Sequence, residues 1–487
     1  MVDLGLRFDN SFAQLPGVFY TRLPPAPLPE PYLVGFSEAA GNLIGIGEDE
    51  LPGLTDALAG NRQIAGSDPL AAVYSGHQFG VYVPRLGDGR ALLLGEAIGP
   101  TGEHWELQLK GSGKTPYSRM GDGRAVLRSS IREFLGSEAL HHLRVPTTRA
   151  LAVIGSDQPV IRETVETAAV TLRMSPSFVR FGSFEYFYWT QQYDALRQLA
   201  DYVIARFYPE CRRAPQPYLA FLEQVARRTA RLVAQWQGVG FCHGVLNTDN
   251  MSILGITIDY GPFGFMDAFD GGYICNHSDV NGRYAYNMQP QIAHWNLYAL
   301  GQALVALTDD VDATRIAVDS YLPEYAQAIN TVFRAKLGLA TEQPEDEALI
   351  TGAVDLLQAT HADWTIFWRV LSTLHVDGSD KVRDLMVDRA AFDEWADRYR
   401  ARLRAECSDD TERTQRMNQI NPKYTLRNHL AEVAIRRARG DEGARDFDEV
   451  ARLLKVLQHP YDEQPEFEGY AQEPPDWARR LELSCSS

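Results

Sequence analysis

Alternating apolar and polar positions mark extended structure in the first third of the chain. Residues 79–83 alternate, a Gly87-Asp88-Gly89 turn follows, and residues 91–95 form a second apolar run. This pattern predicts a β-hairpin. Residues 105–110 alternate again and run into a glycine-rich loop, so we expect a further strand that ends at Lys110.

Apolar positions at helical spacing dominate much of the remaining chain. A helix is predicted to begin at Ser129 or Ser130, with Glu133 in its first turn. A longer helix is predicted over residues 218–236, with Gly238 just beyond its end. Further helices are predicted over residues 297–307, 331–339 and 348–357.

The segment after the long helix has a distinctive order of polar residues. His243 is followed seven residues later by Asn250, and apolar runs at 251–258, interrupted by a glycine, predict a strand pair. An acidic turn, Asp259-Tyr260-Gly261, closes it. This order resembles the large lobe of a protein kinase, in which an aspartate two residues after the histidine accepts a proton. Here that position is Val245, so the usual base is missing.

The pattern as a whole predicts an α+β protein with a bilobal, protein-kinase-like fold. With 487 residues, the chain exceeds the size at which single cores stop growing. We expect an N-terminal extension at 1–70, a small lobe at 71–165, a large lobe at 166–405 and a C-terminal extension at 406–487.

The residue types along these segments suit a nucleoside triphosphate. Asn250 and Asp259 offer oxygen ligands for magnesium. Lys110 and Glu133 have the order of the kinase pair in which a helix carboxylate holds the phosphate-binding lysine. The Gly87-Asp88-Gly89-Arg90 turn would cover the nucleotide. Taken singly, each feature is more often ordinary structure than a site; their shared order favours nucleotide binding.

Three segments make the resemblance more specific: residues 107–119, 122–133 and 243–261. On these, the chain resembles the selenoprotein O family, whose members have a kinase-like fold and transfer AMP. The resemblance extends to Cys485, which is selenocysteine in some members of the family. It implies that ATP binds in an orientation inverted relative to kinases, so that the α-phosphorus meets a protein hydroxyl and pyrophosphate leaves.

The same resemblance implies a set of site residues. The residues implied to contact the nucleotide are Gly87, Gly89, Arg90, Lys110, Asp122, Gly123, Arg173, Arg180 and Asp259. Asn250 and Asp259 would bind Mg²⁺ or Mn²⁺, and Asp249 would accept the proton. The residues themselves allow this, since Asp249 is a carboxylate beside a candidate metal ligand. For Arg173 and Arg180, a solvated surface position remains the alternative to phosphate binding.

The resemblance also implies redox control through Cys275 and Cys485, which are paired in some members of the family. The hypothesis is that this disulfide restrains the segment after the acidic turn. The five cysteines have no Cys-x-x-Cys spacing, so neither a disulfide framework nor a structural zinc site is expected.

Charge and composition further limit the partners and the cellular location that we expect for this protein. The formal net charge is −17, which disfavours a general nucleic-acid surface, because polyanion binding depends on lysine and arginine. No run approaches the roughly 20 apolar residues that span a bilayer. We therefore expect a cytoplasmic protein with no nucleic-acid or membrane partner.

The favoured function is a Mg²⁺-dependent protein adenylyltransferase that moves AMP from ATP to Ser, Thr or Tyr hydroxyls of protein substrates. Three alternatives stay open. One is UMP transfer from UTP with Mn²⁺, and another is a phosphotransferase that uses Asp249 as a displaced base. The third is a non-catalytic pseudokinase scaffold. Val245 favours this alternative, whereas the presence of Lys110, Glu133 and Asp259 argues against it.

Overall fold

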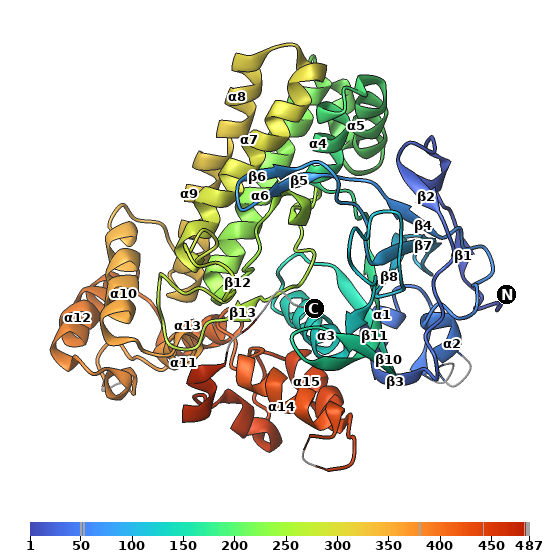
Figure 1. The fold of residues 1–487 in the computed structure, drawn as a ribbon. Coiled ribbons are helices and arrows are strands. Elements are labelled where there is room, and N and C mark those ends of the chain that lie inside the picture. Colours follow the sequence, from blue (N-terminus) through green and yellow to red (C-terminus); the bar gives the residue numbers. More distant parts are fainter. Residues whose placement is uncertain (49–50, 52–53, 379–380, 442, 482, 484–487) are drawn as a thin grey trace.

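The computed structural model describes residues 1–487 apart from 49–50, 52–53, 379–380, 442, 482 and 484–487. Within this described part, an antiparallel sheet is built from residues 7–175, and helices make up most of the chain after residue 180 (Figure 1). The predicted α+β class is confirmed. Among the described residues, none of the helices combines the length and the apolar character that crossing a membrane requires.

The large sheet has the strand order β2-β4-β7-β8-β11-β10-β3, with β1 beside β7 and β9 beside β11. Its strands are β1 (Arg7–Phe8), β2 (Tyr20–Arg22), β3 (Tyr32–Phe36), β4 (Leu70–Ala72), β7 (Ala91–Ile98), β8 (His104–Lys110), β9 (Ala125–Val126), β10 (Arg149–Ile161) and β11 (Val165–Ser175). Two small pairs lie apart from it: β5 (Gly76–Gln78) with β6 (Val81–Val83), and β12 (Phe241–Cys242) with β13 (Gly264–Phe265).

Alternation along β8 separates core residues from site residues. Leu107 and Leu109 enter the apolar cluster shared with α1 (Glu38–Gly41) and α2 (Thr55–Leu58). Gln108 and Lys110 point to the opposite face, because successive side chains of a strand alternate. In the register of β8 with β11, Gln108 lies opposite Arg173. The face of the sheet opposite the apolar cluster, here called its inner face, thus carries the polar residues Gln108, Lys110 and Arg173.

Helix α3 (Leu127–His142) packs across β10 and β11. It starts directly after β9, two residues before the earlier of the two predicted starts, and buries Ile131, Phe134 and Leu135 in the core. Its first turns carry Glu133 toward the inner face of β8, where Lys110 ends the strand. Sheet and helix together therefore position the predicted Lys110–Glu133 pair.

The helices after the sheet form three groups (Figure 1). Their bounds are α4 (Phe181–Trp189), α5 (Tyr193–Phe207), α6 (Pro217–Val239), α7 (Gln289–Thr308), α8 (Val311–Asp319), α9 (Tyr321–Lys336), α10 (Asp346–Thr360), α11 (Trp364–Leu371), α12 (Arg389–Ala405), α13 (Asp410–Asn418), α14 (Asn428–Arg439) and α15 (Asp448–Leu457). Helix α6 packs against α7, α8 and α9 in the first group. Helices α10–α13 enclose a separate core around Trp364, Trp368 and Trp395.

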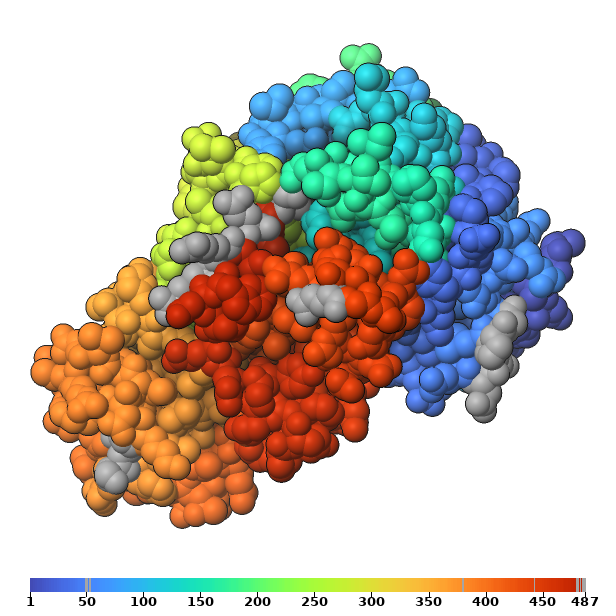
Figure 2. Space-filling model, turned by 60° about the horizontal axis from the view of Figure 1, so that its bottom comes forward, coloured from blue at the N-terminus to red at the C-terminus, as the bar shows by residue number. Residues whose placement is uncertain are grey.

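The third group, α14 and α15, packs on α3. Leu430, Val450 and Leu453 from this pair join the same core as Phe134. Figure 2 shows the red C-terminal residues between the orange helices and the blue N-terminal strands. The chain after α13 therefore returns to the sheet side of the molecule and buries part of α3.

Two local predictions are wrong. Residues 79–83 do not pair with 91–95; instead β6 pairs with β5, and β7 lies inside the large sheet. The reason is the Phe79-Gly80 dipeptide, in which both residues have positive φ (50° and 81°), as a type I′ hairpin turn requires. Residues 251–258 form isolated bridges such as Met251 with Thr257, and no continuous strand pair.

The long helix ends slightly later than its pattern predicts. Helix α6 continues to Val239, and Gly240 closes it in the left-handed conformation (φ 69°). A Cβ on Gly240 would lie 2.7 Å from the Trp364 ring, so a residue without a side chain is required there. The chain then enters β12, which fixes the position of the His243 loop.

Candidate functional site

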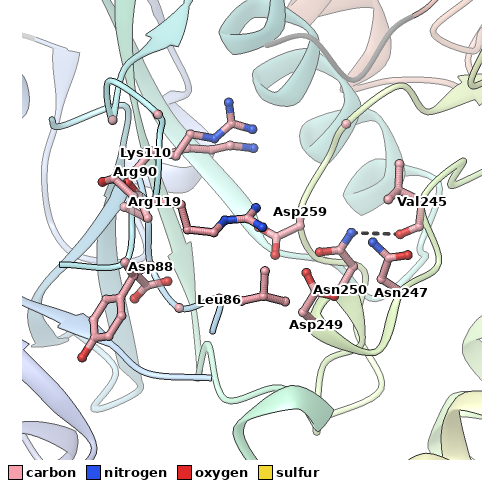
Figure 3. A pocket seen from close by; sticks show the side chains of 18 of the residues that line it. Leu86, Asp88, Arg90, Lys110, Arg119, Val245, Asn247, Asp249, Asn250 and Asp259 are labelled. Atoms are coloured by element: carbon pink, nitrogen blue, oxygen red, sulfur yellow. Dashed lines mark hydrogen bonds between the residues drawn. The ribbon is translucent and has the colours of Figure 1, made fainter. Parts of the chain in front are cut away.

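A cavity of about 580 Å³ lies between the sheet and the segment 245–262 (Figure 3). Its other walls come from loops 86–91 and 117–124 and from the inner ends of β8 and β11. The predicted site residues that line it are Gly87, Gly89, Arg90, Lys110, Asp122, Gly123, Arg173, Asp249, Asn250 and Asp259. Glu133 and Arg180 contact these residues from behind the wall.

The Lys110–Glu133 pair is formed and buried. Lys110 Nζ donates to Oε2 of Glu133 at 2.5 Å and also reaches the carbonyl oxygen of Tyr260 at 3.5 Å. Burial lowers the pKa of Lys110, although Glu133 opposes this shift. A carboxylate in this place keeps the lysine extended at the cavity wall, where its ammonium can meet an anion.

Arg173 links Glu133 to the acidic turn. Its Nη1 donates to Oε1 of Glu133 at 3.0 Å and to Oδ1 of Asp259 at 2.7 Å. Its Nε donates to Gln108 at 2.7 Å, across the β8–β11 pair. Arg173 is therefore a buried member of the network, and a solvated surface position is excluded for it.

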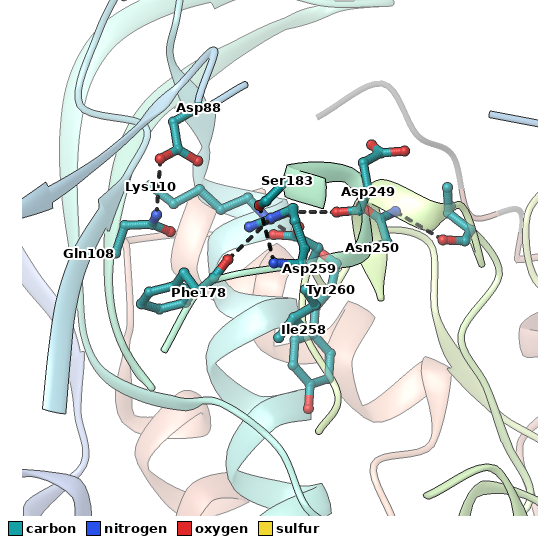
Figure 4. A network of polar contacts seen from close by, with 12 residues as sticks. Asp88, Gln108, Lys110, Phe178, Ser183, Asp249, Asn250, Ile258, Asp259 and Tyr260 are labelled. Carbon is teal, nitrogen blue, oxygen red and sulfur yellow. Dashed lines mark hydrogen bonds and ion pairs between the residues drawn. The ribbon is translucent and has the colours of Figure 1, made fainter. Parts of the chain in front are cut away.

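Arg180 approaches Asp259 from the other side. Its Nη1 donates to Oδ2 of Asp259 and, at 2.7 Å, to the backbone oxygen of Asp249. Figure 4 shows these two aspartates in one network of polar contacts. Burial alone would raise the pKa of Asp259, but Arg180, Arg173 and Lys110 outweigh it and hold that pKa far below its ordinary range. Asp259 is thus an anion at any physiological pH.

Asp249 and Asn250 sit on the short turn η4 (Thr248–Asn250). Burial raises the pKa of Asp249 to about 7, against the opposing effects of Gln78 and Arg180. Its Oδ2 accepts from Nε2 of Gln78 at 3.1 Å, and its Oδ1 has no hydrogen-bond partner among the described residues. A buried carboxylate with a pKa near neutrality has the properties of a general base.

Asn250 is oriented by the residue that replaces the usual kinase base. Its Nδ2 donates to the carbonyl oxygen of Val245 at 2.9 Å. The amide oxygen is then the atom left to serve as a ligand. Val245 itself contributes an apolar side chain to the cavity lining, so no acid–base chemistry is possible at that position.

The donor set around the cavity fits a divalent magnesium-type cation. Asn250 and Asp259 supply amide and carboxylate oxygens, the ligands that hard cations prefer, and few protein ligands suffice when phosphate oxygens complete the shell. Oδ1 of Asp249, which is buried and has no hydrogen-bond partner among the described residues, is a further oxygen at the wall of the same cavity. Mn²⁺ is compatible with the same oxygen set.

A second group of metal-type side chains lies outside the cavity. Ligand atoms of Asp9, Glu96 and His104 lie within 4.8 Å of one another. The guanidinium of Arg206 already contacts Oε1 of Glu96 there. Because an arginine supplies the positive charge, this group gives no support to a second metal centre.

Two of the glycines predicted to contact the nucleotide pack closely against other parts of the chain. Gly87 has φ 98°, and a Cβ on it would lie 2.7 Å from the Tyr117 ring. A Cβ on Gly123 would meet the backbone carbon of Gly113 at 2.1 Å. Asp122 is more exposed and makes a two-point contact with Arg162 at 2.8 and 3.1 Å, which lowers the pKa of Asp122.

Gln78, Asp88 and Arg119 are among the cavity residues to which sequence reasoning assigned no role. The sequence indicates Asp88 only as part of a turn, yet it is buried and accepts from Ala72 N at 2.9 Å. Arg119 extends into the cavity in Figure 3 and has left-handed φ (51°). Arg119 belongs to the segment 107–119 that carries the family resemblance, so the sequence could have indicated it. The position of Gln78 depends on a contact between residues distant in sequence, which the sequence does not show.

Cys275 lies directly beneath the His243 loop. A Cβ on Gly244 would be 2.6 Å from its sulfur, and Sγ reaches the Cys242 carbonyl oxygen at 3.5 Å. Burial raises the pKa of the Cys275 thiol well above its ordinary value. The predicted partner, Cys485, lies outside the described residues. The described Leu483 accepts a hydrogen bond from His277 N at 3.1 Å, so the chain reaches the neighbourhood of Cys275 shortly before its end.

Known proteins are similar to this chain over nearly its whole length. A family model described as "Protein adenylyltransferase SelO" matches residues 3–458. The protein nucleotidyltransferase YdiU of Burkholderia lata is 58% identical over 506 residues, covering 99% of this chain and 96% of that protein. The YdiU of Burkholderia multivorans is 58% identical over 500 residues, covering 98% and 95%, and that of Burkholderia pseudomallei is 57% identical over 501 residues with the same coverage.

The protein is therefore a nucleotidyltransferase. More specifically, the chain belongs to the SelO family, and the selenoprotein O resemblance found in its motifs is confirmed. The non-catalytic scaffold loses its support, since the family and the relatives are described by an enzymatic activity.

Proposed function

We propose that this protein transfers AMP from ATP to Ser, Thr or Tyr hydroxyls of other proteins, within a bilobal kinase-like frame whose cleft is the cavity beside the segment 245–262. The observation that carries the proposal is Asp249, a buried carboxylate with a pKa near 7 at the cavity, in a chain with no acid at position 245. The family description, which names adenylyl transfer to protein, supports the same reaction.

The reaction assigns a task to each group. The acceptor hydroxyl oxygen attacks the α-phosphorus, its proton passes to Asp249, and the bond between the α-phosphorus and the bridging oxygen breaks, so that pyrophosphate leaves with the electron pair. Lys110, held by Glu133, and Arg90 would bind phosphate oxygens. A divalent cation held by Asn250 and Asp259 would neutralise negative charge on the departing pyrophosphate.

Arg173 and Arg180 act on this chemistry through Asp259. Both guanidiniums contact its carboxylate and fix its orientation from opposite sides. When a polyphosphate enters, the same arginines have a second anion within reach, as the family resemblance implies for them. We infer that they position Asp259 and help to bind the nucleotide.

UMP transfer from UTP is the second candidate. The curated relatives are named nucleotidyltransferases without a specified base, which leaves the nucleotide open. The discriminating experiment incubates the protein and a casein-type acceptor with α-labelled ATP or α-labelled UTP, each with Mg²⁺ or Mn²⁺. Greater label incorporation from ATP in both metals supports AMP transfer. Incorporation from UTP alone would replace it with UMP transfer.

Redox control through Cys275 and Cys485 remains a proposal for this site. Its support is the position of Cys275 against Gly244, one residue from His243, together with the packing of Leu483 near the same core. A disulfide there would tether the end of the chain to the loop that carries Asp249 and Asn250.

A further inference from the structure

The β5–β6 hairpin lies directly on the loop that carries Asp249. Three consecutive hairpin residues make three contacts with it. His77 N donates to Oγ1 of Thr248 at 2.7 Å, and Gln78 Nε2 donates to Oδ2 of Asp249 at 3.1 Å. Phe79 N lies 3.4 Å from Oδ1 of Asn247. Within the part of the chain that the structure describes, the hairpin is a sheet of its own, and these three contacts join it to the loop.

Glycine makes this contact possible. A Cβ on Gly76 would lie 2.8 Å from Oδ1 and 2.9 Å from Cβ of Asp249, closer than real side chains approach. On the other side, a Cβ on Gly182 would meet the carbonyl oxygen of Ser75 at 2.0 Å and the Cα of Asp249 at 3.4 Å. Asp249 therefore lies between two backbone segments that pack against it without side chains.

Two further contacts hold the hairpin in place, one in strand β5 and one at its turn. His77 Nδ1 lies 2.5 Å from Oε2 of the buried Glu185 on α4. At the turn, Phe79 has φ 50°, which is strained for a bulky residue, and its N–H donates to the Tyr284 hydroxyl at 2.8 Å. Tyr284 in turn donates to Asn247 at 2.5 Å. A strained turn held by loop residues indicates a functional constraint on the hairpin.

We propose that Gln78 is a positioning residue for Asp249, and that the β5–β6 hairpin orients the carboxylate of Asp249 toward the acceptor hydroxyl. The inference rests on the proposed function, in which Asp249 accepts the proton. A terminal carboxylate rotates over a broad range unless a partner fixes it. Gln78 is the side-chain donor to this carboxylate among the described residues, because the other oxygen has no partner there.

The test uses Gln78→Met, which keeps the length of the side chain and removes its donor. We expect kcat for transfer from α-labelled ATP to fall about 10- to 100-fold, as small misplacements of a catalytic group do. KM for ATP and the melting temperature are expected to stay within error. Val81→Ala, on the same hairpin at a position that is 68% exposed, is the matched control and should behave as wild type.

A double-mutant cycle separates positioning from any independent role. In an Asp249→Asn background, measured by single turnover, Gln78→Met should cause no further loss, because its effect passes through the carboxylate that is gone. An equal additional loss, or a raised KM for ATP in the single variant, would overturn the inference. Gly76→Ala, which forces the hairpin away from Asp249, should reproduce the kcat defect with ATP binding retained.

The same data separate this inference from the proposed function. Undiminished label transfer by Asp249→Asn would refute the proton-acceptor role, and the inference with it. Loss of transfer in Asp249→Asn, combined with a wild-type rate in Gln78→Met, would refute the positioning role alone.

Discussion

Asn250 donates its amide hydrogen to the carbonyl oxygen of Val245 at 2.9 Å, so the residue at the vacated base position orients a candidate metal ligand through its backbone. Val245 stands where the kinase pattern has its catalytic aspartate. In the proposed function, Asp249, four residues further along the same loop, takes the role of the base, and Asn250 remains a metal ligand.

Val245→Asp is expected to fold normally, because the backbone oxygen that holds Asn250 is retained. It should not convert the protein into a phosphotransferase, since the proposed chemistry depends on Asp249 and on an inverted nucleotide. Incubation with γ-labelled ATP checks this. Protein-bound γ-label above the wild-type level would mean that the nucleotide can also lie in the kinase orientation.

Glu133→Gln should weaken both nucleotide binding and stability. The substitution removes the anion between Lys110 and Arg173, and loss of one partner of a buried ion pair costs about 3–5 kcal/mol. We expect KM for ATP to rise about tenfold and the melting temperature to fall. Glu223→Gln, which breaks an exposed pair with Arg227, is the control and should change stability by less than about 1 kcal/mol. Equal effects of the two substitutions would contradict the network.

Divalent metal should bind weakly without nucleotide. Both oxygens of Asp259 accept from arginines, so a cation that arrives alone must compete with Arg173 and Arg180. A polyphosphate offers these arginines another anion and the metal further oxygen ligands. Calorimetry with Mn²⁺ is expected to show at least about tenfold tighter binding in the presence of a non-hydrolysable ATP analogue. Equal affinity in both conditions would show that Asp259 is free to bind metal by itself.

Glu106→Gln should stabilise the protein at alkaline pH. Burial raises the pKa of Glu106 to about 8, against the N–H of Phe178, which donates to it at 2.6 Å. At pH 4 the carboxyl is mostly neutral in the folded and unfolded states, so its burial costs little there. Between the ordinary pKa of 4.5 and the folded pKa of about 8, the unfolded chain is ionised while the folded carboxyl stays protonated, so stability falls across this range and the full loss remains above pH 8.

The neutral amide of Glu106→Gln avoids that loss. We expect its melting temperature to exceed that of wild type by a few degrees at pH 8 and to match it at pH 4. Glu103→Gln, at an exposed position of the preceding turn, is the control. A difference between Glu106→Gln and wild type that is the same at both pH values would contradict the raised pKa.

Much of the site was predictable because it follows local order. Lys110 ends a strand with clear alternation, and Glu133 falls in the next helix, so their meeting follows from sheet and helix geometry. The Asp249, Asn250 and Asp259 spacing is likewise local. The contacts of Arg173 and Arg180 were not predicted: the family resemblance implied nucleotide binding for both, whereas in the structure they meet at Asp259 across long sequence separations.

The hairpin error has a different origin. Residues 79–83 alternate like a strand, and nothing in that alternation indicates that Phe79 adopts positive φ. A bulky residue at that turn position is unfavourable locally and is stabilised by Tyr284, which is distant in sequence. The role of Gln78 was hidden for the same reason, since its contact with Asp249 follows from the turn.

Oxidation should slow the enzyme through Cys275 if the proposed disulfide forms. Non-reducing peptide mapping is expected to recover a Cys275–Cys485 cross-link, and reduction should raise the rate of label transfer. Cys485→Ala should be as active as the reduced wild type under both conditions. Free thiols at both positions under oxidising conditions would refute the pairing. The exposed Cys407 provides the control, as Cys407→Ala should keep the redox response.

The central claim is that the innermost phosphate of ATP is transferred, with Asp259 required. The most direct measurement gives the protein ATP that carries different labels on the α- and γ-phosphates and follows both labels in acceptor protein and released product. We expect the α-label on protein, the γ-label in pyrophosphate, and neither on protein with Asp259→Ala. The γ-label on protein, or full α-label transfer by Asp259→Ala, would contradict the account.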